Sequence, residues 1–146
     1  MINLYRYLGI ILIPFIKINL SLRLIKGKES KIRLSERFGK SSKQRPAGDI
    51  IWIHAASVGE FKSADLIINK LYKKYTILVT TTTLSAANYA SKYYNKKIIH
   101  QFAPLDIHPW VNRFLNKWQP KLVVWIESDL WPTTMHLIKK RDIKSI

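Results

Sequence analysis

The chain has no cysteine among its 146 residues. This absence excludes disulfides, thiolate metal sites and catalytic cysteines, and it fits a reducing compartment. Glycine and proline are sparse, at five and six residues. No glycine-rich phosphate motif such as GxGxxG or a Walker sequence is present, so the usual fingerprints of nucleotide binding are missing.

Acidic residues are scarce as well. Nine carboxylates stand against twenty-five lysines and arginines, which gives a formal net charge of +16. Residues 1–49 hold eleven of the basic and three of the acidic residues, so half of the excess lies in the first third of the chain. A charge of this size favours a polyanionic partner. We expect an anionic membrane surface and no nucleic acid, because no recognisable nucleic-acid module accompanies the charge.

Long apolar runs are also missing. The uncharged run from Tyr7 to Ile16 is ten residues long and contains Pro14, whereas a membrane-spanning helix needs about 20 mostly apolar residues. Large apolar residues nevertheless recur at helical spacing on one face, at Leu4, Leu8, Ile11, Phe15, Ile18, Leu22 and Ile25. We predict an amphipathic helix over residues 1–26 that anchors the chain at a membrane. A signal peptide and a helix packed against its own domain are the alternatives.

Residues 27–49 form a basic connector that Gly27, Gly39, Pro46 and Gly48 punctuate. A short helix over residues 31–38, ended by Gly39, is predicted within it. We expect most of its charge to lie on a solvated face, with phosphate contact as a second hypothesis.

After residue 49 the pattern alternates between strand-like and helical segments. Strands are predicted at 50–55, 76–81, 97–102 and 121–126, with a fifth from Ile143, and helices near 60–74, 84–94, 108–118 and 130–141. This alternation predicts an α/β fold with a Rossmann-like parallel sheet and helices on both faces. In the common doubly wound order 3-2-1-4-5, the first and fourth strands are neighbours.

An acidic turn follows each of those two strands: Ala56-Ser57-Val58-Gly59-Glu60 and Glu127-Ser128-Asp129-Leu130-Trp131-Pro132. The assumed strand order brings Glu60 and Glu127 into one crevice. Glu60 lies near a helix start, where the helix dipole keeps a carboxylate ionised, so it can accept a proton from an attacking hydroxyl. A purely structural role at the helix start is the alternative.

Other residues of the two turns have less specific roles. The backbone around Ser57 and Gly59 can donate hydrogen bonds to an anionic group. Pro132 suits the first turn of a helix, and Ser128 or Asp129 can cap that helix, so capping is as reasonable a role for Asp129 as a catalytic one.

These turns, together with Thr80–Thr83 and Ala103-Pro104-Leu105-Asp106, resemble the amino-terminal half of the 3-deoxy-D-manno-octulosonic acid (Kdo) transferases. The resemblance implies the first domain of a glycosyltransferase B (GT-B) fold. It implies transfer of Kdo from CMP-Kdo to a lipid A precursor, lipid IVA, with inversion, in lipopolysaccharide biosynthesis at the cytoplasmic face of the bacterial inner membrane. By resemblance Glu60 is the general base and Glu127 an acceptor-site residue, supported by Ser57, Gly59 and Asp129.

Members of that family carry a second, carboxy-terminal domain, which we expect this chain to lack. We therefore expect residues 50–146 to be a truncated acceptor-binding domain, with the donor CMP-Kdo bound mainly by the absent domain and with no cofactor. A separately encoded carboxy-terminal domain is a candidate partner. The four histidines show no metal-ligand spacing, so no metal is expected. The alternative function is a non-catalytic fragment that binds membrane or lipid A precursor, or the remnant of a disrupted gene.

Overall fold

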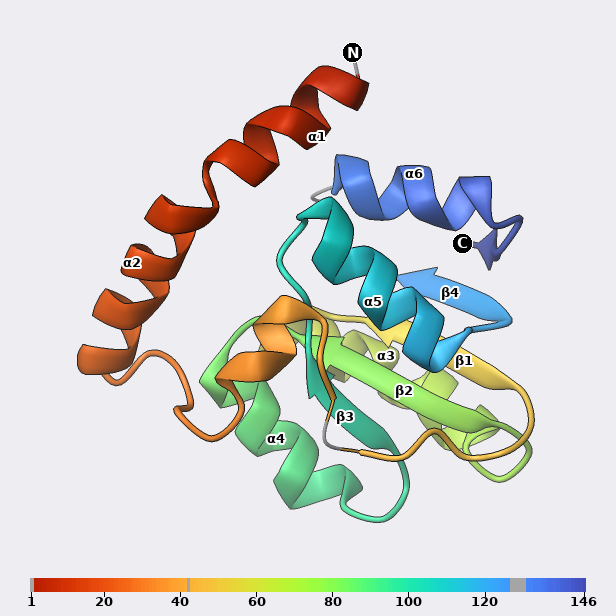
Figure 1. Cartoon of the computed structure of the whole chain (residues 1–146). Coiled ribbons are helices and arrows are strands. Elements are labelled where there is room, and N and C mark those ends of the chain that lie inside the picture. The colour runs from red at the N-terminus through yellow and green to blue at the C-terminus, as the bar shows by residue number, and fades with distance from the viewer. Residues whose placement is uncertain (1, 42, 127–130) are drawn as a thin grey trace.

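A five-stranded parallel sheet lies at the centre of the computed structural model, which describes residues 2–41, 43–126 and 131–146 (Figure 1). The strands are β1 (Ile50–His54), β2 (Thr76–Thr81), β3 (Ile99–Phe102), β4 (Leu122–Trp125) and β5 (Lys144–Ser145). Their order in the sheet is β3-β2-β1-β4-β5. The predicted α/β class and strand order are confirmed, so β1 and β4 are neighbours although far apart in sequence.

Two pairs of helices cover the two faces of this sheet. The helices are α3 (Val58–Leu71), α4 (Leu84–Tyr94), α5 (His108–Trp118) and α6 (Pro132–Lys140). Ile51 and Ile53 of β1 share a buried cluster with α3 and α4, whereas Ile50 and Trp52 share one with α5 and α6. Because successive strand residues point to opposite faces, an unbroken apolar strand is what a sheet buried on both sides requires.

The connector covers the open edge of the sheet at β3. Its 3-10 helix η1 (Leu34–Phe38) ends at Gly39, in the left-handed conformation with φ 72°, so a short helix ended by Gly39 is confirmed. The Glu36 carboxylate accepts a hydrogen bond from the Phe102 N–H at 2.6 Å, and Arg33 donates to the His100 carbonyl at 3.3 Å. These bonds satisfy backbone groups that an edge strand would otherwise leave open to another chain.

Part of the connector's charge is buried. The Glu29 carboxylate lies between Arg23 and Arg37, at 2.9 and 3.0 Å, and the Glu29 and Arg37 side chains are 2% and 4% exposed. Glu36 is also buried. The expectation of a solvated face is confirmed for the lysines of the connector, which are exposed. It is wrong for Glu29, Glu36 and Arg37, which are buried because each acid has a guanidinium partner close in sequence.

The amino-terminal segment is two helices, α1 (Ile2–Ile11) and α2 (Ile13–Ile25), rather than the single helix expected. They are bent by 53°, and Pro14 lies in the first turn of α2. Proline interrupts a continuous helix because it has no N–H and its ring clashes with the preceding turn. Among the described residues, no single helix is long and apolar enough to cross a membrane, whereas the bent pair passes the same test together.

The two helices have an outer and an inner face. The outer face consists of the seven residues whose spacing predicted an amphipathic helix, and all are exposed, from 49% for Leu8 to 81% for Ile25. On the inner face Leu20 is buried, the Tyr5 hydroxyl donates to Asp106 at 3.4 Å, and Gly9 lies against Ile107. The helices flank the α/β body, with α1 beside α5 and α6 (Figure 1).

We predict that Gly39→Ala lowers the free energy of unfolding by at least about 2 kcal/mol, measured by chemical denaturation. A Cβ at this position meets the carbonyl group of Trp110, and the left-handed backbone alone costs about 1–2 kcal/mol. Gly27→Ala is the matched control, because Gly27 has φ +66° but open space around it. Equal losses in the two variants would contradict the role of the close contact with α5.

Candidate active site

Glu60 is held at the carboxyl end of β1 by a capping box. Ser57 is the N-cap of α3, and its side chain accepts a hydrogen bond from the Glu60 N–H at 3.3 Å. In return Glu60 Oε2 accepts from the N–H groups of Ala56 at 2.6 Å and Ser57 at 3.2 Å. This reciprocal arrangement satisfies N–H groups that have no partner within the helix.

The capping box orients the Glu60 carboxylate without using all of it. Only Oε2 accepts the two backbone hydrogen bonds, so Oε1 is not part of the box. The side chain is partly exposed. The two interpretations of Glu60, a structural acid at the helix start and a base for a hydroxyl group, are therefore compatible, because each uses a different oxygen.

Ser57 and Gly59 lie in this same turn. Ser57 is the N-cap of α3. The N–H groups of Ser57 and Ala56 both donate to Glu60 Oε2, so they already have an acceptor. Gly59 is in the first turn of α3, where an added Cβ would meet only Ser57 Oγ, at the ordinary distance of 3.8 Å. The local fold therefore does not require glycine at this position.

The end of β4 lies beside the end of β1. His54 pairs with Trp125, and the Ile126 N–H donates to the His54 carbonyl at 3.0 Å. The convergence inferred from strand order is thus observed up to Ile126. Glu127 and Asp129 lie outside the described residues, and their predicted roles stay predictions.

Asp106, in the loop after β3, accepts the hydrogen bonds at the start of α6. Its carboxylate takes the N–H groups of Thr133 and Thr134, at 2.9 and 2.8 Å, and the Thr134 hydroxyl at 2.7 Å. Pro132 occupies the first turn of α6, as predicted, and the N-cap position is Trp131. A cap from a different loop is not readable from local sequence, although Asp106 belongs to one of the motifs that carry the family resemblance.

Buried polar and aromatic side chains pack together at the carboxyl ends of β1, β2 and β4, next to the Glu60 turn. His54 is fully buried, and its Nδ1 lies 2.8 Å from the Thr80 hydroxyl, which also accepts from the Trp52 indole at 2.8 Å. The rings of Trp125 and Trp131 pack on His54, with centroids 4.2 and 4.8 Å away. Thr80 therefore belongs to the core rather than to the crevice.

An open pocket of about 600 Å³ lies at the same edge of the sheet. One wall comes from α1 and α2 and the other from the loops that follow β2 and β3. It is lined by Tyr5, Ile16, Asn19, Leu20, Arg23, Glu29, Arg37, Thr82, Thr83, Leu105, Asp106, Ile107 and Trp131. Of the four threonines at the end of β2, Thr82 and Thr83 line it, whereas Thr80 and Thr81 are fully buried.

Comparison with known families shows where this chain belongs. The family profile described as 3-deoxy-D-manno-octulosonic-acid transferase (kdotransferase) matches residues 32–146. This match covers most of the chain and includes both acidic turns. The chain belongs to this family.

Several curated Kdo transferases are similar to the chain. A probable mitochondrial 3-deoxy-D-manno-octulosonic acid transferase from Arabidopsis thaliana is 40% identical over 133 residues, covering 89% of this chain and 30% of the relative. The 3-deoxy-D-manno-octulosonic acid transferase from Rickettsia bellii is 37% identical over 144 residues, covering 97% of this chain and 34% of the relative. The one from Haemophilus influenzae is 34% identical over 145 residues, covering 95% and 34%. The chain thus spans about a third of the length of these relatives.

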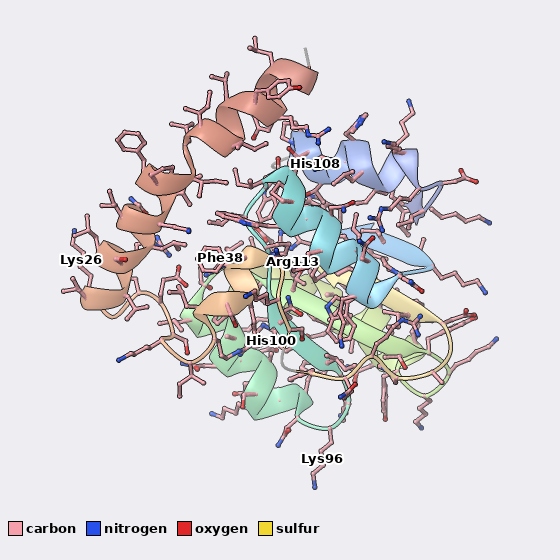
Figure 2. The ribbon with its side chains drawn as sticks, viewed as in Figure 1. Lys26, Phe38, Lys96, His100, His108 and Arg113 are labelled. Atoms are coloured by element: carbon pink, nitrogen blue, oxygen red, sulfur yellow. The ribbon has the colours of Figure 1, made fainter. Side chains whose placement is uncertain are left out.

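His100, on β3, is a buried titratable group that contacts the connector of this Kdo transferase family chain (Figure 2). Arg33 Nη2 lies 2.9 Å from His100 Nδ1, and Thr81 Oγ1 lies 2.9 Å from Nε2. Because a guanidinium can only donate, Nδ1 is the acceptor and the proton lies on Nε2. Burial lowers the pKa of His100 to about 3, and the positive charges of Arg33, Lys43 and Arg37 add to this effect.

The neutral His100 predicts a pH-dependent stability. An unfolded histidine has a pKa near 6.5, so between about pH 6.5 and pH 3 the unfolded chain binds one more proton than the folded chain at this site. The free energy of unfolding then falls as the pH is lowered, by at most about 1.4 kcal/mol per pH unit from this group. Denaturation curves between pH 7 and pH 4 measure it.

The variant His100→Asn isolates this contribution. Asparagine keeps a carbonyl acceptor for Arg33 but does not titrate, so the slope of stability against pH should become shallower than in the parent chain. An unchanged slope would show that another group controls the acid sensitivity.

Proposed function

We propose that this chain is the acceptor-binding half of a Kdo transferase of GT-B architecture, acting in lipopolysaccharide biosynthesis. The observation that carries the proposal is Glu60. Its carboxylate is fixed at the carboxyl end of β1, beside the end of β4, in a chain that belongs to the family. In open parallel α/β sheets, ligands bind at the carboxyl ends of two neighbouring strands whose following connections lead in opposite directions. Here the chain leads from β1 to β2 on one side and from β4 to β5 on the other.

In the proposed reaction Glu60 Oε1 accepts the proton of a hydroxyl group on a lipid A precursor, lipid IVA, while the capping box holds Oε2. The hydroxyl oxygen forms a bond to the anomeric carbon of Kdo as the bond from that carbon to CMP breaks. CMP leaves with the electron pair, and attack from the opposite side inverts the anomeric centre. Glu127, Ser57, Gly59 and Asp129 are proposed to orient the acceptor around this base.

The donor CMP-Kdo is proposed to bind mainly to a second domain, since the relatives are about three times as long as this chain. A separately made carboxy-terminal domain is therefore the proposed protein partner. Transfer is proposed to need both halves, with the crevice above β1 and β4 facing the donor.

The outer face of α1 and α2 supports attachment to an anionic membrane, which we propose to be the cytoplasmic face of the bacterial inner membrane. Seven large apolar side chains lie exposed along these helices. Burying such a side chain contributes about 1.5–3 kcal/mol, enough together to hold the helices in the interfacial region. Lysines of the adjacent connector lie exposed near the end of α2, where Lys26 is seen in Figure 2, and each basic residue near an anionic surface adds about 1 kcal/mol.

We predict that Glu60→Gln lowers Kdo transfer by at least about 100-fold, the usual contribution of a general base. Glutamine also serves in a capping box, so the thermal midpoint should change little. Glu60→Ala should lose transfer and also about 1 kcal/mol of stability, because the side chain that accepts the N–H groups of Ala56 and Ser57 is removed from the capping box. The assay is mass spectrometry of lipid A precursor with freshly generated CMP-Kdo and the chain, with and without the carboxy-terminal portion of a complete relative.

Full transfer by the folded Glu60→Gln variant would overturn the base assignment. No mass gain in either mixture, from a folded parent chain that binds lipid A precursor, would leave binding without catalysis as the function of this chain.

We predict that Phe15→Ser with Ile18→Ser weakens binding to anionic vesicles about 100-fold, measured by flotation. These side chains are 67% and 59% exposed on the outer face, and losing about 1.5 kcal/mol from each corresponds to that factor. Leu66→Ser with Tyr93→Ser is the matched control, because these residues are 66% and 53% exposed on α3 and α4. Equal weakening in both pairs would show that the outer face is not the binding surface.

A further inference from the structure

The inner face of α2 points toward the α/β body and forms one wall of the 600 Å³ pocket. Ile16, Asn19 and Arg23 line it, whereas Phe15, Ile18 and Leu22 of the outer face do not. At 100° per residue, the centres of the two sets lie about 100° apart around the helix, with Asn19 nearest the outer face and Ile16 farthest from it. One helix therefore offers an apolar surface on one side and a pocket wall on another.

The opposite wall is connected to the Glu60 turn. Thr82 lines the pocket, and both its N–H and its hydroxyl donate to the Ala56 carbonyl, at 3.1 and 3.0 Å. The N–H of Ala56 in turn donates to Glu60 Oε2. A group bound against Thr82 thus lies next to the backbone that orients the proposed base.

The charge of this pocket is positive at the α2 end. Two guanidiniums, of Arg23 and Arg37, share the single carboxylate of Glu29, which leaves one net positive charge. Arg37 is buried and also donates to the Thr82 carbonyl at 2.6 Å, so it holds the wall in place. Arg23 is 39% exposed and can donate to a ligand as well as to Glu29.

The remaining polar groups differ in their availability. Asp106 accepts hydrogen bonds from the start of α6 and from Tyr5, so its oxygens are occupied and its negative charge lies at the α6 end of the pocket, away from Arg23. Asn19 is exposed, and within the described residues its amide has no hydrogen-bond partner. Arg23 and Asn19 therefore provide the polar contacts on the α2 side, four residues apart on one helix face.

Apolar side chains complete the pocket. Leu20, Leu105, Ile107 and the Trp131 ring line it, and such surfaces with a few convergent polar groups are typical of small-molecule sites. A sugar ring has apolar C–H faces that suit these walls, and a phosphate suits a guanidinium. A free amide suits sugar hydroxyl groups.

We propose that this pocket binds the phosphorylated sugar headgroup of a membrane-embedded glycolipid, with Asn19 and Arg23 contacting the headgroup while the outer face of the same helices lies in the bilayer. The inference rests on the proposed function and deepens it. The amino-terminal helices then form part of the acceptor site and also attach the chain to the membrane. A lipid source is chosen over a free sugar phosphate because the apolar outer face lies on the same helix as the pocket residues Asn19 and Arg23.

The test compares vesicles that contain lipid A precursor with vesicles of equal charge that contain phosphatidylglycerol. We predict that the full chain prefers the glycolipid vesicles by at least tenfold. Asn19→Asp places a negative charge in the pocket and should abolish the preference, and Ile16→Trp should do the same by filling the pocket. Ser21→Asp is the matched control, because it adds the same charge to α2 away from the pocket residues and should keep the preference. Circular dichroism checks that each variant is folded.

The outcomes separate this inference from the proposed function. A preference retained by folded Asn19→Asp and Ile16→Trp would overturn the pocket assignment and leave acceptor binding intact. No preference in the parent chain would overturn both. If soluble glucosamine 1-phosphate competes at the concentration at which the glycolipid binds, the ligand need not be a lipid and that part of the proposal is wrong. Competition only at far higher concentrations would support a membrane-embedded glycolipid.

Discussion

The carboxylate of Glu29 joins the amino-terminal helices to the α/β body. It is nearly inaccessible to solvent and accepts hydrogen bonds from Arg23 on α2 and from Arg37 in the connector. Arg37 in turn donates to the Thr82 carbonyl after β2. Removing one member of a buried ion pair costs about 3–5 kcal/mol because the remaining charge has no partner. The position of α2, the pocket beneath it and the direction of its outer face all depend on this link.

The few acidic residues of a very basic chain lie at junctions between elements. Six carboxylates on the described residues join segments or lie at the start of a helix. Glu29, Glu36 and Asp49 form ion pairs, and Glu60, Asp65 and Asp106 accept hydrogen bonds. The lysines remain on the surface. The protein thus uses its acids for internal structure and leaves its positive charge for an external anion, which agrees with a membrane and a phosphorylated acceptor as partners.

The parts of the fold that local patterns determine could be predicted from the sequence. The covered sheet follows from periodicity, and the start of α3 from the S-x-x-E spacing of Ser57 and Glu60. The strand order is the one common to doubly wound folds, which local patterns do not determine. Pro14 is the local signal for the bend between α1 and α2. The burial of Glu29 and the cap from Asp106 depend on contacts between distant segments. Periodicity does not reveal such contacts, so the pocket that they shape could not be predicted from the sequence.

The central claim is that α1 and α2 lie between a bilayer and the acceptor pocket. Because the chain has no cysteine, single cysteines introduced at Ile18 of the outer face and at Ile16 of the pocket wall can each carry one nitroxide label. Electron paramagnetic resonance in anionic vesicles then reports contact with lipid-soluble oxygen and with a water-soluble nickel complex. We predict that the label at position 18 is accessible to oxygen and shielded from nickel, and that the label at position 16 remains accessible to nickel. Two labels that are both in lipid, or both in water, would contradict it.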